Sequence, residues 1–168
     1  LKDLREGSLY EIISSIIVFI GAILAIVSLF TLNIFLHHHV LRDSIIVSIV
    51  LGIILIIAGA ILGIIGIIKL RSGFNLLKNS GLDVSIGSTG ATLILISLGL
   101  LIAGVLTVII YVGIFIMVVA AILGLIGYIM VGLGFYNLGK GFNNSTIEAA
   151  GVLIIVGGII NIIISIGV

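Results

Sequence analysis

The stretch that decides the fold is IIVSIVLGIILIIAGAILGIIGII, residues 45–68, which contains no charged side chain. At about 1.5 Å per residue, a helix of this length exceeds the roughly 30 Å hydrocarbon core of a bilayer. Apolar side chains would cover every face of that helix, and only lipid or other helices solvate such a surface. The stretch therefore predicts a membrane-spanning helix.

Further apolar runs flank this stretch on both sides. Residues 12–36 form one run, and residues 149–168 form the last. Residues 91–131 contain no charge and are too long for one crossing, so they predict two helices, at about 90–109 and 113–137, joined by a turn at residues 107–113. A single long helix over 91–131 is the alternative. We expect an all-α, polytopic transmembrane helix bundle of about five spans, forming one transmembrane domain over residues 1–168.

The composition excludes a water-soluble fold. The chain is 62% apolar and 8% charged, with a mean hydropathy of +1.61, whereas soluble domains are about 45–50% apolar and 25% charged. Cysteine is absent, which removes disulfides, thiolate metal sites and cysteine nucleophiles. Proline is absent too, so nothing in the sequence forces the broken helices that many transporters use.

The distribution of basic residues predicts the orientation of the chain. With five spans, six of the seven fall on the side of the N-terminus and only Arg42 falls opposite; the six are Lys2, Arg5, Lys69, Arg71, Lys78 and Lys140. The positive-inside rule then predicts a multi-pass protein of the cell membrane with a cytoplasmic N-terminus and an external C-terminus. The glycosylation sequons at Asn143 and Asn144 would lie in a cytoplasmic loop and remain unmodified.

An internal repeat aligns residues 52–94 with residues 113–155 without a gap, and 15 of the 43 positions are identical. The irregular spacing of the matched glycines is retained through a polar loop of the same length. Each copy reads as helix, cytoplasmic loop, helix. The repeat predicts a duplicated helical hairpin whose two copies are parallel.

Small residues recur along one face of three predicted helices. Such stripes allow helix backbones to approach closely in lipid, where the hydrophobic effect does not drive helices together. The expected packing residues are Ser14, Gly21, Ala25 and Ser28 in the first span, Gly52, Gly59, Gly63 and Gly66 in the second, and Gly113, Ala120, Gly124 and Gly127 in the fourth. Three stripes exceed the need of a five-helix monomer, so we expect at least one to face a partner or another copy.

The polar loops of the repeat carry a resemblance to a known family. Leu70-Arg71-Ser-Gly73-Phe74 and Gly132-Leu-Gly134-Phe135-Tyr136-Asn-Leu138-Gly139, with a glycine opening the last helix at Gly151, resemble the archaeal multi-pass membrane proteins of domain-of-unknown-function family 973. The resemblance covers about residues 52–168. It implies an archaeal cell membrane and a bundle of five or six spans, and it supplies no catalytic residue.

The side chains with site chemistry are few. His37, His38 and His39 are weak candidates for a metal site, because consecutive helical residues point about 100° apart and no cysteine or paired carboxylate completes a ligand set. An interfacial cap on the first span is the favoured interpretation of the three histidines. Glu11 is the carboxylate nearest the hydrocarbon, and we favour electrostatic stabilisation of a helix N-terminus over a proton relay for it.

Lipid is the expected partner of the basic residues. Arg71, Lys78 and Lys140 are predicted to meet anionic head groups, with Phe74, Leu77 and Phe142 inserted at the interface as parts of short amphipathic turns. Nucleic-acid binding would need a larger basic face than seven scattered cations provide.

The sequence favours a structural or accessory integral membrane subunit that acts by helix packing, bound to lipid and to other membrane subunits or to copies of itself. No catalytic residue and no cofactor are predicted, so we do not expect an enzyme. A small channel or transporter is the alternative, which the duplication permits and the lack of intramembrane acids disfavours.

Overall fold

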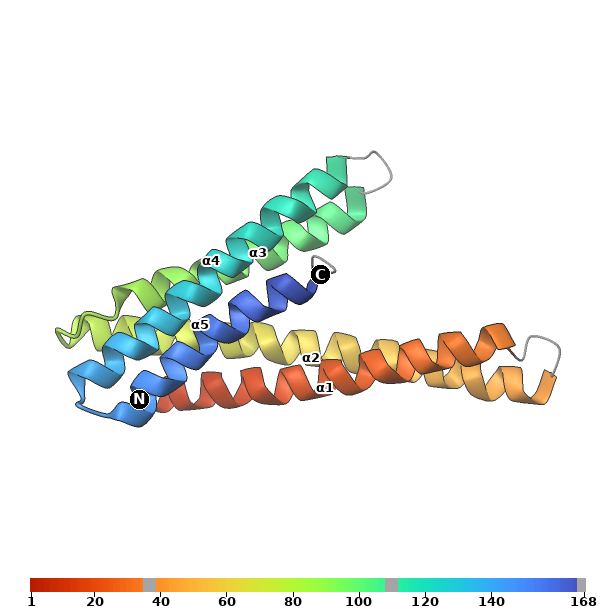
Figure 1. Cartoon of the computed structure of the whole chain (residues 1–168), viewed down its shortest axis with the longest axis horizontal. Coiled ribbons are helices and arrows are strands. Elements are labelled where there is room, and N and C mark those ends of the chain that lie inside the picture. Colours follow the sequence, from red (N-terminus) through yellow and green to blue (C-terminus); the bar gives the residue numbers. More distant parts are fainter. Residues whose placement is uncertain (35–38, 108–111, 166–168) are drawn as a thin grey trace. The chain divides into compact units, whose positions relative to one another are not determined.

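The computed structural model consists of five α-helices, with no strand, in the part of the chain that it describes. It describes the backbone of residues 1–34, 39–107 and 112–165, and the side chains of residues 1–31, 44–107 and 112–160. The helices are α1 (Lys2–Ile34), α2 (His39–Asn79), α3 (Ser85–Thr107), α4 (Val112–Gly141) and α5 (Ser145–Ser165) (Figure 1). The all-α prediction is confirmed.

Four of these helices are long and apolar enough to cross a membrane. The qualifying segments are Lys2–Thr31, Ser44–Asn79, Ser85–Leu106 and Val112–Gly141. Large apolar side chains project outward from them, as at Phe30 (71% exposed) and Phe115 (77% exposed), where lipid would solvate them. In α5 the described apolar segment, Ser145–Ile160, is shorter, so a fifth span stays a prediction.

The uncharged run of residues 91–131 is divided between α3 and α4. The helix α3 ends at Thr107 and α4 begins at Val112. Residues 108–111, where the sequence predicts the turn, lie outside the described residues. Two antiparallel helices therefore occupy this stretch in place of one long helix.

The helix α2 continues well beyond the apolar run that predicts it. We expected the second span to end at residue 68, but α2 runs on through Lys69 and Arg71 to Asn79. Its 41 residues amount to about 60 Å of helix, twice the hydrocarbon thickness. A hydropathy pattern predicts that a span ends at its first charged residue, but a charged side chain does not interrupt the backbone hydrogen bonds of a helix. The helix α2 ends at the Ser80-Gly81 turn, where Gly81 has a φ of 87°.

The described contacts divide the chain into two compact units, where the sequence suggested a single transmembrane domain. One unit contains Leu1–Arg5 together with Ile67–Val168, and the other contains Glu6–Gly66. The second unit is the antiparallel pair of α1 and α2. The first comprises the C-terminal part of α2 and the helices α3, α4 and α5.

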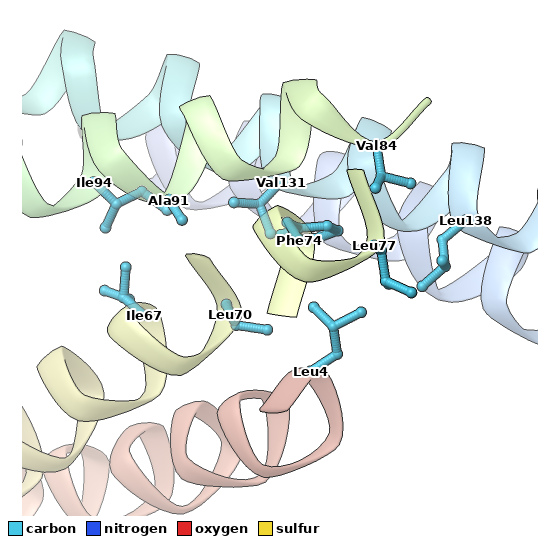
Figure 2. Close-up of a cluster of buried hydrophobic side chains, with 10 residues drawn as sticks. All are labelled: Leu4, Ile67, Leu70, Phe74, Leu77, Val84, Ala91, Ile94, Val131 and Leu138. Atoms are coloured by element: carbon cyan, nitrogen blue, oxygen red, sulfur yellow. The ribbon is translucent and has the colours of Figure 1, made fainter. Parts of the chain in front are cut away.

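A cluster of buried apolar side chains holds the first unit together. Phe74, among the side chains drawn in Figure 2, is 0% exposed. Its ring meets that of Phe135 edge-on, with 5.2 Å between the ring centroids. The other members come from four segments of the chain: Leu4, Ile67, Leu70, Leu77, Val84, Ala91, Ile94, Val131 and Leu138.

Two side chains of this cluster correct a prediction. Phe74 and Leu77 were expected to insert into the lipid interface, but they are 0% and 9% exposed and pack inside the protein. Amphipathic turns at a membrane surface and helix turns on a protein core have the same pattern of apolar and basic residues, so periodicity alone does not separate them. Phe142 remains exposed, at 46%.

Candidate functional site

The small-residue stripes of α1 and α2 face each other and form a seam, which we call the first seam. A Cβ atom placed on Gly21 would lie 2.8 Å from the carbonyl oxygen of Gly52, and one placed on Gly52 would lie 2.8 Å from that of Gly21 and 3.1 Å from the Cβ of Ala25. Real Cβ atoms do not approach a carbonyl so closely. Only glycine therefore fits where the two backbones cross.

A serine hydroxyl bridges the first seam. Ser14 is 7% exposed, and its Oγ donates a hydrogen bond to the carbonyl oxygen of Gly59 at 2.8 Å. The same Oγ lies 2.8 Å from the position of a Cβ on Gly63. Further along, a Cβ on Gly66 would lie 3.0 Å from the carbonyl oxygen of Gly7. The Ser14 hydrogen bond contributes about 0.6 kcal/mol in a membrane protein, and the glycine contacts add close approach of the two helices.

At the other end of the first seam, α1 and α2 enclose a groove of about 390 Å³. Ser28, 6% exposed, lies in it beside Ser44 and Ser48 of α2. The hydroxyl of Ser48 donates to the carbonyl oxygen of Ser44, four residues earlier. The groove therefore holds the last of the predicted packing residues of α1.

The stripe of α4 faces α3 and forms a second seam. A Cβ on Gly104 would lie 2.9 Å from the carbonyl oxygen of Gly113, and one on Gly127 would lie 2.8 Å from that of Gly90. Between these crossings, Gly124 faces the hydroxyl of Ser97 at 3.1 Å. Ala120, on the same helix, is 1% exposed.

The two seams have glycine or serine at most corresponding positions, in the same order, and Ala120 stands in the second seam where the first has Gly59. Along α1 they run Gly7, Ser14, Gly21, and along α3 they run Gly90, Ser97, Gly104, an offset of 83 residues. On the facing helices Gly52, Gly63 and Gly66 correspond to Gly113, Gly124 and Gly127, at the offset of 61 residues that the sequence repeat shows.

The two offsets differ by 22 residues. The chain between Gly21 and Gly52 in the first hairpin is longer by this number than the chain between Gly104 and Gly113 in the second. A comparison at the offset of 61 residues therefore misses the likeness of α1 to α3, and Gly7, Gly90, Ser97 and Gly104 were not among the expected packing residues. The glycine and serine spacing of seven residues is the signal that would have found them.

Because each predicted stripe is opposed by a helix of the same chain, the expectation that one of the three faces a partner is wrong for the described residues. The stripes of α1 and α2 oppose each other, and the stripe of α4 opposes α3. A stripe shows that a backbone is approached closely, but its periodicity does not say by which helix.

A third seam joins α4 to α5 through the glycines of the family motif. A Cβ on Gly151 would lie 2.5 Å from the backbone nitrogen of Tyr136 and 2.6 Å from the carbonyl oxygen of Gly132, and one on Gly139 would meet the backbone of Glu148. A Cβ on Gly134 would lie 2.6 Å from the Cα of Gly87. The motif is therefore a packing element in this chain.

The three basic residues proposed for lipid head groups are exposed. Arg71 and Lys78 lie on the C-terminal part of α2, and Lys140 lies in the last turn of α4. The Nζ of Lys140 is 4.8 Å from the centroid of the Tyr136 ring, a cation–π contact. A role for these residues in binding lipid stays a prediction.

The histidines fall largely outside the described residues. His37 and His38 are not described, and His39 begins α2 with a side chain that is not described. Among the side chains described elsewhere in the chain, no group of three or more histidines, cysteines or carboxylates could hold a metal ion.

Glu11 does not lie at a helix N-terminus. The helix α1 begins at Lys2, so Glu11 is in its third turn, beyond the first turn in which the helix dipole stabilises an acid. The predicted electrostatic role of Glu11 is therefore wrong. Its Oε1 atom is buried and has no hydrogen-bond partner among the described residues.

Comparison with known proteins yields one match. The family described as "Protein of unknown function (DUF973)" matches residues 1–168, the whole chain, and so extends the resemblance from residues 52–168 to the first helix as well. No curated protein and no solved structure matches the chain.

Proposed function

The chain belongs to the DUF973 family, and we propose from this premise that it acts by association in the membrane, as a structural or accessory subunit that performs no chemistry. Its partners would be other integral membrane subunits or further copies of itself, together with lipid. The family description assigns no function, so the proposal rests on the surface of this chain.

Two helical glycines that lie in no contact with the described part of the other helices carry this proposal. Gly99 on α3 and Gly157 on α5 are exposed, and no described atom lies within 4 Å of where their Cβ atoms would be. The chain uses glycine for close backbone contact at its three internal seams. Two further glycines on exposed helix faces offer the same close contact to another protein.

We expect a Gly99→Leu, Gly157→Leu double variant to fold normally and to associate more weakly. The added side chains have open space within the chain but would hold a partner's backbone away. A loss of about 1.4 kcal/mol would lower the association constant roughly tenfold. Native mass spectrometry from a mild detergent, with co-purification from native membrane, measures it.

The matched control is Ile96→Leu, which exchanges one exposed apolar side chain of α3 for another of equal size. It should leave association unchanged. A parent protein that is monomeric and free of associated proteins under the same gentle conditions would contradict the accessory role. Ion flux through liposomes that contain this lone protein would instead favour the channel or transporter.

The orientation of the chain is part of the proposal, with the N-terminus cytoplasmic and the C-terminus external. Asn144 lies between α4 and α5, where its Oδ1 accepts hydrogen bonds from the backbone nitrogens of Thr146 and Ile147 and so caps α5. We expect no glycan on Asn143 or Asn144 after insertion into microsomes. Glycan on either residue would place this loop outside and reverse the orientation.

A further inference from the structure

Glu11 lies in the first seam, on the side of α1 that meets α2. A Cβ on Gly66 would lie 3.1 Å from the backbone nitrogen of Glu11 and 3.0 Å from the carbonyl oxygen of Gly7. The side chain of Glu11 is therefore attached where the backbones of α1 and α2 approach each other closely.

The second seam shows what packing alone requires at this position. There, a Cβ on Gly127 would lie 3.0 Å from the backbone nitrogen of Ile94 and 2.8 Å from the carbonyl oxygen of Gly90. Ile94 therefore has the backbone position in the second seam that Glu11 has in the first. Ile94 is 3% exposed and belongs to the buried cluster, so an apolar side chain satisfies the packing.

The carboxyl group of Glu11 is placed where an unpaired negative charge is costly. Its Oε1 is buried without a hydrogen-bond partner among the described residues, and burying an unpartnered carboxylate is strongly unfavourable. The facing part of α2, residues 44–66, contains no titratable side chain. On α1 the titratable side chains within two turns of Glu11 are Arg5, Glu6 and Tyr10. Of these three, only Arg5 is a cation.

Lys69, the first charged residue of α2 beyond Gly66, belongs to the other compact unit. A bound proton neutralises the Glu11 carboxylate without needing room for a second side chain or an ion. A membrane carboxyl group that packing does not require is by default a functional group.

We propose that Glu11 is a proton-binding site within the first seam, which takes up and releases a proton opposite a segment of α2, residues 44–66, that has no titratable side chain. A protonated carboxyl of this kind reacts with a membrane-soluble carbodiimide. The carboxyl proton moves to one nitrogen of the reagent while a carboxyl oxygen bonds to its central carbon. The acyl group then shifts from that oxygen to nitrogen, so that a C–O bond breaks, a C–N bond forms and no atom leaves.

The experiment treats the full-length protein in lipid vesicles with dicyclohexylcarbodiimide over a pH series. We expect the intact mass to rise by one reagent, peptide mapping to place the adduct on Glu11, and labelling to fall as the pH rises. A water-soluble carbodiimide with an added amine serves as the control, and it should label the exposed Asp83 and leave Glu11 unmodified.

Glu11→Gln keeps the shape of the side chain and removes the proton-binding group, so it should abolish labelling by the membrane-soluble reagent. Mapping of the unaltered protein decides the proposal even where that variant does not fold. Absence of the adduct from Glu11 at every pH would overturn the proposal. Equal labelling of Glu11 and Asp83 by the water-soluble reagent would overturn it as well.

Discussion

A Gly90→Leu variant is expected to lose most of the stability of the α3–α4 hairpin. A Cβ on Gly90 would lie 2.6 Å from the carbonyl oxygen of Gly127 and 2.7 Å from the backbone nitrogen of Val131. These are backbone atoms, so no rotation of a side chain relieves the clash. Overpacking costs about 1–3 kcal/mol and sometimes more, and we expect a loss of about 3 kcal/mol or greater here. Thermal unfolding in mild detergent measures it.

Three other glycine variants bracket this result. Gly63→Leu and Gly124→Leu should cost less, because the nearest atom in each case is a serine hydroxyl, of Ser14 and of Ser97 respectively. Gly99→Leu should cost nothing, since its Cβ would meet open space. If Gly90→Leu were as well tolerated as Gly99→Leu, the second seam would not be a close backbone contact.

Replacement of Phe74 by alanine is expected to be the most damaging truncation in the first unit. The ring is 0% exposed, contacts Phe135 edge-on, and lies 2.7 Å from where a Cβ on Gly87 would be. Removing a buried phenylalanine costs about 3–5 kcal/mol, because the lost contacts leave a cavity. The free energy of unfolding, measured by denaturant titration in detergent, should fall by about that amount.

Phe115→Ala is the matched control for this truncation. Phe115 is 77% exposed on α4, so its removal creates no cavity and should change the free energy of unfolding little. Equal losses for the two phenylalanines would contradict a buried role for Phe74 and would return it to the lipid interface that the sequence suggested.

The apolar runs were sufficient to predict that the chain is helical and resides in a membrane. In lipid each backbone group needs a partner within its own segment, and a long uncharged run satisfies this only as a helix. Residues 45–68 lie within α2, and the uncharged residues 91–131 fall into α3 and α4. The helix ends were less predictable, because charged side chains such as Lys69 continue a helix as readily as they end a span.

The candidate site was predictable as a set of residues but not as a set of contacts. Periodicity alone picked out Ser14, Gly59 and Gly124, because a helix places every seventh residue on nearly the same face. The partners of these residues depend on which helices lie side by side. The extra 22 residues of the first hairpin hid the correspondence of α1 with α3 from a comparison at the offset of 61 residues.

The amino-acid sequence by itself determined the membrane environment, the helices and the small residues that pack them, because each of these depends on local composition and spacing. Only the tertiary structure decided that the stripes meet within the chain and that Phe74 is buried. It also decided that Glu11 has the backbone position in the first seam that Ile94 has in the second. Those outcomes depend on contacts between segments far apart in sequence, and a pattern along one helix carries no information about the surface opposite it.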